Sequence, residues 1–259
     1  MSRMITQSQK TMNGVELRTP PLPDPPNRVT PGRRPDRLVV ACVWFKGPNY
    51  PTSKYVAVLK NMVARNLTIP HDFVCITPHK DELPDGVIAM TPPTPPVGQS
   101  VAGEADKNWW HKVGLFSPNL FGPSTRVLYF DLDVIIINSL DNIASCEDMF
   151  CMIENFGPNK GHAAHNSSVM LWYPTPATHK IFTQFSPDVT KELHGDQCWI
   201  WRVMTDDIIR DFERYQCVSY KYEKHPQWQH RTNATSVVIF HGKPKPHEIS
   251  TDPLSAHWK

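Results

Sequence analysis

The sequence has no apolar run near the ~18 residues that a membrane span requires, and residues 1–10 lack the apolar segment of a secretory signal. It also lacks an excess of charge of one sign, because 27 Lys and Arg against 25 Asp and Glu leave a net charge of +2. Such a balance gives no basic patch for nucleic acid or for a membrane surface. We therefore expect a cytoplasmic protein with no transmembrane segment and no nucleic-acid partner.

The six cysteines show no C-x-x-C spacing. Most of them stand beside apolar residues, which is typical of buried, reduced thiols in a cytosolic protein. A set of disulfides is the alternative, and we favour reduced thiols. The six positions are Cys42, Cys75, Cys146, Cys151, Cys198 and Cys217.

Proline is unevenly distributed along the chain. Residues 1–36 contain seven prolines and little apolar periodicity, so this segment is predicted to be a disordered tail that buries too little surface to become ordered. Residues 37–250 carry the patterns of one globular domain. Residues 251–259 are polar and are predicted to form a C-terminal tail.

Strand and helix patterns alternate within this domain. The apolar run 37–45 is typical of a buried strand, the turn cluster 46–51 follows it, residues 53–65 have a helical apolar pattern, and 73–77 form the next strand. This order predicts a βαβ unit, and hence an α/β fold with a mostly parallel central sheet flanked by helices. Further strands are expected at 126–130, 150–153, 166–172 and 237–241, and helical segments at 109–116, 180–185 and within 194–201.

The central motif is Arg126-Val-Leu-Tyr-Phe-Asp-Leu-Asp133, an apolar strand that ends in two acids. Because unpaired buried carboxylates are heavily penalised, the pair is expected where the sheet ends and a crevice opens. Residues two apart in an extended chain lie on the same side, so Asp131 and Asp133 can approach one Mg²⁺ or Mn²⁺, which would in turn hold a diphosphate. Two solvated acids at a strand end are the alternative.

Five other features each have a functional and a structural interpretation. The loop 91–108 is a lid or an ordinary surface excursion. Lys112 is either a phosphate ligand or a solvated side chain. The small residues from Asn166 onwards either let a sugar approach closely or form an ordinary loop that leads into a strand. Asp196 is a substrate contact or a helix N-cap. His241 is a metal ligand by residue type or a structural histidine at a strand end.

In chain order these features resemble the family 8 glycosyltransferases, the group that includes glycogenin and the bacterial lipopolysaccharide galactosyl- and glucosyltransferases. The likeness covers about residues 38–247 and implies a single GT-A, Rossmann-like domain. The matching features are the opening strand with its tyrosine-bearing loop, Trp110-His-Lys-Val-Gly-Leu-Phe116, the D-x-D strand, Asn166-Ser-Ser-Val-Met170, Gly195-Asp-Gln197 and His241-Gly-Lys-Pro-Lys-Pro246.

The resemblance implies a metal and a donor site. Asp131, Asp133 and His241 would hold one Mn²⁺ or Mg²⁺ against the donor diphosphate. Lys245 would contact a phosphate. The other positions expected to bind the nucleotide-sugar donor are Val43, Tyr50, Lys112, Asp131, Leu132, Asn166, Ser167 and Gly242.

The resemblance also implies a catalytic pair. Asp196 and Gln197 match the residues that face the sugar and the acceptor in that family. Two positions depart from the family pattern, since His247 stands where an aromatic residue often follows Lys-Pro and Ser168 stands where glycine is usual. Both departures leave the sugar preference open.

The expected activity is transfer of a hexose from a nucleotide diphosphate sugar, with UDP as the expected nucleotide, to a glycan, lipid-linked or protein acceptor. A divalent ion and a lysine at the leaving diphosphate would stabilise the charge that builds there in the transition state. One alternative is a haloacid-dehalogenase-like phosphatase, whose D-x-D stands near the start of the chain, whereas here it follows 130 residues. The other is a non-catalytic nucleotide-sugar-binding protein.

Overall fold

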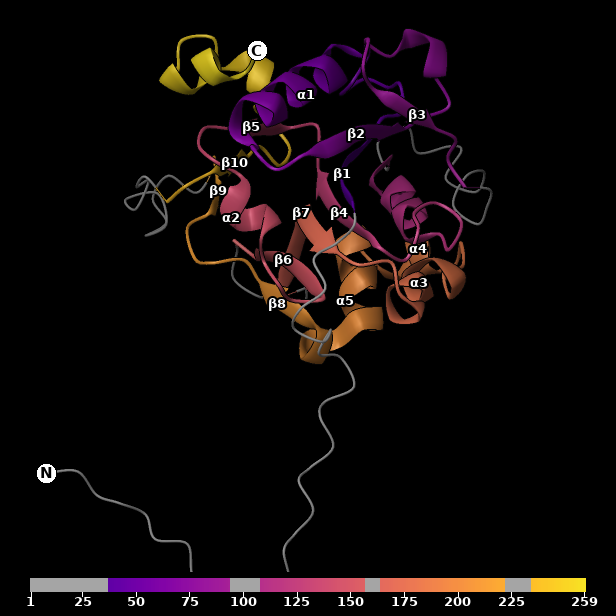
Figure 1. Cartoon of the computed structure of the whole chain (residues 1–259). Coiled ribbons are helices and arrows are strands. Elements are labelled where there is room, and N and C mark those ends of the chain that lie inside the picture. Colours follow the sequence, from indigo (N-terminus) through magenta and orange to yellow (C-terminus); the bar gives the residue numbers. More distant parts are fainter. Residues whose placement is uncertain (1–36, 94–107, 157–163, 222–233) are drawn as a thin grey trace, which may run out of the picture.

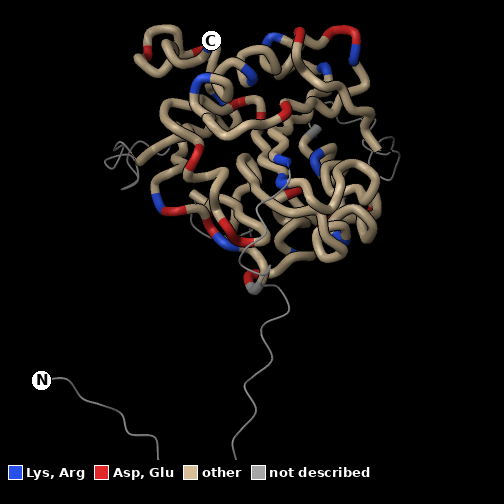
Figure 2. Tube along the Cα trace, in the orientation of Figure 1, with Lys and Arg blue, Asp and Glu red and all other residues tan. Residues whose placement is uncertain are grey.

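The computed structural model describes residues 37–93, 108–156, 164–221 and 234–259 (Figure 1). The predicted tail 1–36 and most of the predicted loop 91–108 lie outside the described residues. Acidic and basic residues are interspersed along the described chain (Figure 2), in keeping with the balanced composition. No helix among the described residues is long and apolar enough to cross a membrane.

A seven-stranded sheet forms the centre of the fold, in the order β3-β2-β1-β4-β7-β6-β8. Neighbours pair in parallel except β7, which runs antiparallel to both β4 and β6. The predicted mostly parallel sheet is therefore confirmed. The strands are β1 (Arg37–Val43), β2 (His71–Ile76), β3 (Ile88–Met90), β4 (Thr125–Phe130), β6 (Phe150–Glu154), β7 (His165–Trp172) and β8 (Ile209–Asp211).

The central strands β1 and β4 of the main sheet are buried on both faces, which explains why their sequences are mostly apolar. Successive side chains in a strand point to opposite faces, so Leu38, Val40 and Cys42 of β1 join one hydrophobic cluster. Val39 and Ala41 join a second cluster on the other face. Figure 1 shows α1 (Lys54–Asn66) on one side of the sheet and α3 (Pro176–Thr183) and α5 (Asp196–Ile208) on the other.

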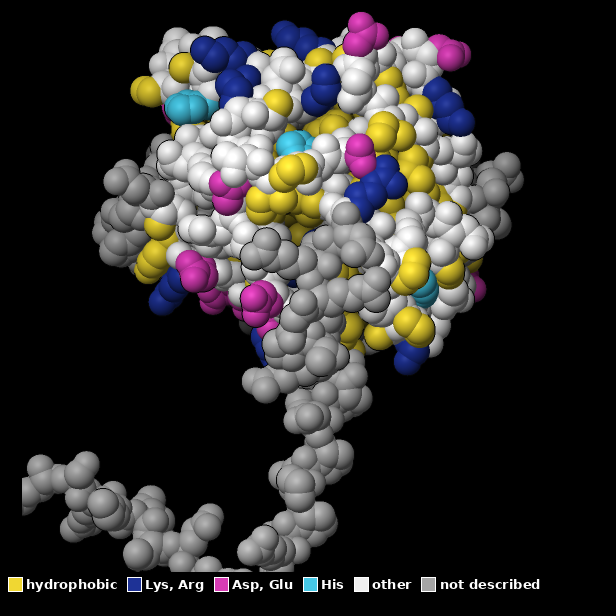
Figure 3. All heavy atoms as spheres, viewed as in Figure 1, with side chains coloured by type: hydrophobic (Ala, Val, Ile, Leu, Met, Phe, Trp, Pro, Cys, Tyr) yellow, Lys and Arg dark blue, Asp and Glu magenta, His cyan; other side chains and the backbone are white. Residues whose placement is uncertain are grey.

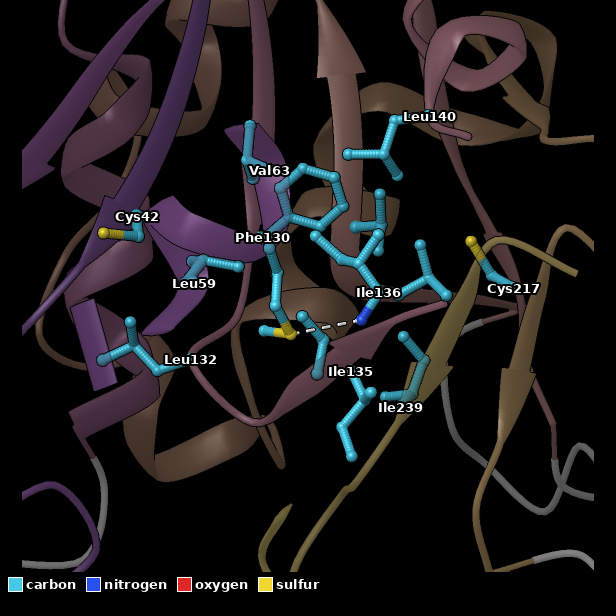
Figure 4. Packing of buried hydrophobic residues seen from close by; sticks show 14 of the residues in the cluster. Cys42, Leu59, Val63, Phe130, Leu132, Ile135, Ile136, Leu140, Cys217 and Ile239 are labelled. Atoms are coloured by element: carbon cyan, nitrogen blue, oxygen red, sulfur yellow. Dashed lines mark hydrogen bonds between the residues drawn. The ribbon is translucent and has the colours of Figure 1, made fainter. Parts of the chain in front are cut away.

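Helix α1 connects β1 to β2 and confirms the predicted βαβ unit. Its buried residues recur at helical spacing, so they form one face that packs on the sheet. Figure 4 shows Leu59 and Val63 of α1 beside Phe130 at the end of β4. The buried residues of α1 are Tyr55, Val56, Val58, Leu59, Met62 and Val63.

The opposite face is covered by η2 (Asn108–Phe116), α3 and α5. The predicted helix at 109–116 is a run of 3₁₀ turns, and the helix predicted at 180–185 begins earlier, at Pro176. Thr175 explains that earlier start. Its side chain accepts a hydrogen bond from the N–H of Thr178, whose hydroxyl accepts from the N–H of Thr175, forming a capping box. Pro176 at the first helical position is pre-set for a helix.

A second sheet of three strands lies beside the main one, in the order β5-β10-β9. Its strands are β5 (Val134–Ile136), β10 (Val237–Ile239) and β9 (Cys217–Ser219). The strand predicted at 237–241 was expected to share the parallel sheet with the D-x-D strand, and this expectation is wrong, because β10 lies in the second sheet, antiparallel to β5 and parallel to β9. The antiparallel register brings the end of β10 to the start of β5, directly after Asp133.

The remaining elements are short. The last residues pack against α1, since Arg65 donates hydrogen bonds to the backbone carbonyls of His257 at 2.9 Å and Lys259 at 2.5 Å, and Leu254 is buried. All six cysteines are free thiols, and all but Cys146 are buried. The short elements are η1 (Lys80–Glu82), α2 (Asp141–Ala144), α4 (Val189–Glu192), η3 (Pro246–Glu248) and η4 (Pro253–His257).

A buried histidine links β7 to the elements beside it. His165 opens β7 and is 6% exposed. Its Nδ1 lies 2.8 Å from Asp211 Oδ1 and its Nε2 lies 3.1 Å from Asp206 Oδ1. Burial opposes the imidazolium, but the two carboxylates outweigh burial and raise the pKa of His165. A protonated His165 therefore ties the start of β7 to β8 and α5.

Because this pKa is raised by folding, its contribution to stability is fully present below the unfolded value of ~6.5 and is lost as the pH rises through the folded value. We expect His165→Gln to lower the free energy of unfolding at about pH 5 and to have a smaller effect at about pH 9. Urea denaturation at the two pH values measures the difference. His257→Gln removes an exposed histidine and is the control. An equal loss at both pH values would contradict the ion pair.

Candidate functional site

A pocket of about 450 Å³ lies where the two sheets meet. Figure 3 shows hydrophobic side chains gathered near the middle of the face viewed, with charged and histidine side chains beside them. Every site residue predicted from the sequence lines this pocket. They are Val43, Tyr50, Lys112, Asp131, Leu132, Asp133, Asn166, Ser167, Asp196, Gln197, His241, Gly242 and Lys245.

The D-x-D segment crosses from the main sheet to the second sheet. The backbone N–H of Asp131 donates to the carbonyl of Ser168 in β7 at 2.9 Å, and the N–H of Phe240, directly after β10, donates to the carbonyl of Asp133 at 2.9 Å. Leu132 between them is 4% exposed and belongs to the hydrophobic cluster that includes α1. The backbone turns at Leu132 and Asp133, so that Leu132 packs against the core while the flanking carboxylates line the pocket.

Lys112 joins Asp131 to Asp196. Its Nζ lies 3.1 Å from Asp131 Oδ1 and 3.1 Å from Asp196 Oδ2, and it donates to Ser167 Oγ at 3.0 Å. Ser167 in turn donates to Asp196 Oδ2 at 2.6 Å. Burial opposes the ammonium charge, but the two carboxylates outweigh burial and raise the pKa of Lys112. Lys112 is therefore a fixed positive charge inside the pocket wall, and the solvated alternative is wrong because the residue is only 7% exposed.

Asp196 does not cap α5. Gly195 occupies the N-cap position, and Asp196, the first helical residue, directs its carboxylate to Lys112. The N-cap interpretation of Asp196 is therefore wrong. Gly195 allows a close approach instead, since a Cβ there would lie 3.3 Å from Nε1 of Trp109.

Lys245 pairs with the second acid of the motif. Its Nζ donates to Asp133 Oδ2 at 2.6 Å and to Tyr50 Oη at 3.3 Å. Burial raises the pKa of Asp133, repulsion from Asp131 adds to this, and Lys245 acts in the opposite direction. Burial and the same two carboxylates raise the pKa of Tyr50, which therefore remains a phenol. Asp133 and Lys245 are each 6% exposed, so this is an ion pair shielded from water.

His241 follows β10 at the pocket edge. Its Nε2 lies 2.7 Å from Ser219 Oγ. Burial lowers the pKa of His241 to about 4, helped by the positive charges of Lys221 and Lys245. The imidazole is therefore neutral at neutral pH, which is the form that binds metals. Gly242 after it has φ +78°, a left-handed conformation that favours glycine.

The donor atoms of Asp131, Asp133 and His241 suit Mn²⁺ or Mg²⁺, because two carboxylates and a neutral imidazole line one pocket. In the described residues these three do not form a group whose ligand atoms all lie within 4.8 Å of one another. Asp133 contacts Lys245 instead, and His241 contacts Ser219. Chelation of one ion would therefore require Asp133 to exchange its lysine for the ion. The metal roles stay a prediction.

Sequence reasoning missed the aromatic wall of the pocket. Trp109, 36% exposed, and Phe45 both line it, and the Phe45 ring stacks on His111 at 3.6 Å between centroids. Tyr129 was assigned to the strand core, yet its hydroxyl donates to Asp131 Oδ1 at 2.7 Å. The alternation of side chains along a strand could have revealed this contact, because Tyr129 and Asp131 are two residues apart and lie on the same side.

The comparisons with known proteins concern the fold. No family model matches the sequence, and no curated protein matches it. The galactosyltransferase LgtC, solved with donor and acceptor sugar analogs, is similar in structure with a TM-score of 0.59 and 15% identity over 85% of this chain and 93% of that one. The glycosyltransferase GlyE of Streptococcus pneumoniae TIGR4 has a TM-score of 0.58 and 14% identity over 86% of this chain and 59% of its own. The chain therefore has the GT-A glycosyltransferase fold, as predicted.

The Lys112 network is tested through stability. Lys112→Met should lower the free energy of unfolding by about 3–5 kcal/mol, because it leaves the buried carboxylate of Asp196 and the partly buried carboxylate of Asp131 without their ammonium partner. Adding Asp196→Asn should restore part of that loss by removing one of the two charges. Urea denaturation measures both of these variants and the Asp196→Asn single variant. Lys191→Met, which breaks an exposed pair with Asp188, is the control and should change little. Simple addition of the two single effects would contradict the network.

Proposed function

We propose that the protein is a metal-dependent glycosyltransferase that moves a hexose from a UDP-sugar to an acceptor. The observation that carries this proposal is the buried contact of Asp133 with Lys245 at 2.6 Å in the pocket. A carboxylate is a ligand for a hard divalent cation, and an ammonium is a partner for phosphate. A metal–diphosphate pair offers both residues a partner at the same time. The GT-A fold around the pocket supports the same function.

Lys245 is the residue that changes partner in this proposal. Its ammonium pairs with Asp133 and is withheld from water. When the diphosphate enters, Lys245 turns to a phosphate oxygen, and Asp133 becomes available as a ligand. A divalent ion held by Asp131, Asp133 and His241 would add positive charge next to the leaving diphosphate oxygen. Lys245 supplies the same stabilisation from the protein, most strongly as the bond to the sugar breaks.

The sugar would lie toward the other half of the pocket. There Asp196 and Gln197 begin α5, and Asn166 Nδ2 lies 3.5 Å from Gln197 Oε1. Asn166 is held by its Oδ1, which accepts from the N–H of Ser168 at 2.9 Å. A carboxylate and two amides give the donors and acceptors that sugar hydroxyls need. We assign these residues to the hexose and the acceptor.

The aromatic wall has a role in excluding water. Trp109 and Phe45 give part of the pocket an apolar surface. Water competes with the acceptor for the activated sugar, so an apolar wall that fits the substrates favours transfer over hydrolysis. The acceptor is therefore proposed to pack against Trp109, which is exposed enough to be reached.

UDP binding should require a divalent ion. We expect titration calorimetry with Mn²⁺ to give at least about tenfold tighter UDP binding than in EDTA, a difference of ~1.4 kcal/mol. Asp133→Asn should remove most of this dependence, because it removes a metal ligand. Asp188→Asn alters an exposed carboxylate and should leave it unchanged. Equal UDP affinity with and without EDTA would contradict the proposed metal site.

Turnover tests the function itself. We expect Mn²⁺-dependent release of UDP from a UDP-hexose and no hydrolysis of a generic phosphate ester. Asp133→Ala and His241→Ala should each greatly weaken turnover, and the double variant should lose little more than the worse single, because one broken site cannot be broken twice. Phosphate-ester hydrolysis would favour the phosphatase, and binding without turnover would favour a non-catalytic protein. If the turnover losses of the two single variants multiply in the double variant, His241 does not belong to the site.

A further inference from the structure

Two cysteines face each other at the start of β6, outside the residues that line the pocket. Cys146 follows α2 and Cys151 lies in β6, and their Sγ atoms are 2.7 Å apart. An S–S bond is about 2.05 Å long, so a small side-chain movement would join them. Cys146 is half-buried, whereas Cys151 is 0% exposed. Solvent therefore reaches one sulfur of the pair and not the other.

A buried arginine provides positive charge beside this pair. Arg126, at 1% exposure, donates from Nη2 to the carbonyls of Cys146 at 2.5 Å and Asp148 at 2.7 Å. Its Nη1 is buried and has no hydrogen-bond partner within the described part of the chain. The Tyr173 ring lies 4.1 Å from the guanidinium carbon. A buried guanidinium with an unused N–H favours an anion nearby, and a thiolate is the anion that this cluster can form.

The two sulfurs are electrostatically unequal. The pKa of Cys146 is lowered, chiefly by its hydrogen bond with the Cys151 thiol, with help from the N–H of Asp148 and from Arg126, while burial and the Asp148 carboxylate act in the opposite direction. The same contact, together with burial, raises the pKa of Cys151. Cys146 is thus the more acidic and the more accessible thiol, as a nucleophilic cysteine must be.

We propose that Cys146 and Cys151 form a dithiol modification site that a small disulfide, such as oxidised glutathione, converts to an intramolecular disulfide. The Cys146 thiolate attacks one sulfur of the oxidant, forms a mixed disulfide and releases one thiolate, which takes a proton from solvent. Cys151 then loses its proton to solvent and attacks Cys146 Sγ, which releases the second thiol. The protein loses two hydrogen atoms, and one small disulfide is reduced to two thiols.

The same cluster is less suited to a metal. The ligand atoms of Cys146, Asp148 and Cys151 lie within 4.8 Å of one another, which is a spacing that zinc could use. The Arg126 guanidinium acts electrostatically on both sulfurs, so it opposes a divalent cation and stabilises a thiolate. The geometry therefore favours oxidation over zinc binding.

A second cysteine pair in the fold is a matched control. Cys42 of β1 and Cys75 of β2 are register partners on neighbouring parallel strands. Both are 0% exposed, and burial raises the pKa of Cys42. This pair shares the proximity of the proposed site and lacks its access and its acidity, so it should stay reduced in the folded protein.

The experiment is peptide mapping of the full chain after incubation with oxidised glutathione, unfolding in iodoacetamide and digestion with trypsin. The tryptic peptide 127–160 contains Cys146 and Cys151 alone, and the other four cysteines fall in four separate peptides. We expect this peptide to be two hydrogens lighter than its reduced form and to carry no alkyl group. The peptides of Cys42 and Cys75 should be fully alkylated. Full alkylation of peptide 127–160, or a Cys42–Cys75 link in its place, would overturn the proposal.

Single variants test the order of the two steps. Cys151→Ser should trap glutathione on Cys146, because the resolving thiol is missing. Cys146→Ser should leave Cys151 unmodified, because the remaining sulfur is buried. Glutathione on Cys151 alone would overturn the assignment. Stoichiometric Zn²⁺ binding to the reduced wild-type protein that is lost in both variants would assign the cluster to a metal and overturn the proposal.

Discussion

The site depends on one electrostatic constraint, which is that the two carboxylates of the D-x-D motif, Asp133 buried and Asp131 partly buried, must be compensated. Asp131 is compensated by Lys112 at 3.1 Å, and Asp133 by Lys245 at 2.6 Å. Lys112 comes from η2, and Lys245 follows β10 more than a hundred residues later. Because leaving either charge unpaired would cost several kcal/mol, these two ion pairs bind distant segments of the chain to the middle of the fold.

The backbone makes this possible by changing sheets at the motif. Asp131 is hydrogen-bonded to β7 of the main sheet and Asp133 to the residue after β10. A single parallel sheet would present its polar residues along one edge, whereas here they converge from two sheets. His241 reaches the pocket for this reason, since β10 runs antiparallel to β5 and ends opposite the motif. The long apolar strands β1 and β4 support the point at which the chain passes from one sheet to the other.

The parts of the fold that could be predicted are those with a strong local pattern. The apolar runs of β1 and β4 predict buried strands, and the helical spacing of α1 predicts an amphipathic helix. The three-residue strand β10 could not be placed in this way, because a short apolar run carries no information about its partner, and we assigned it to the wrong sheet. The role of Tyr129 was hidden for a related reason, since an aromatic residue in an apolar strand is usually core. That distant residues such as Lys245 and Asp133 share one site came only from the family resemblance, and the direct contact between these two was not predicted.

On the proposed function, the buried ion pairs also determine how ligands would be bound. Asp133 and Lys245 are already shielded from water, so a metal–diphosphate ligand would exchange one buried pairing for two others and would desolvate no new protein charge. The pairing of Asp133 with Lys245 competes with either ligand arriving alone, because each would leave one buried charge without a partner. Both ligands together remove this conflict. Binding of the ion and of the diphosphate must therefore favour each other, with a reciprocal coupling free energy, and Lys245 is the residue through which that coupling acts.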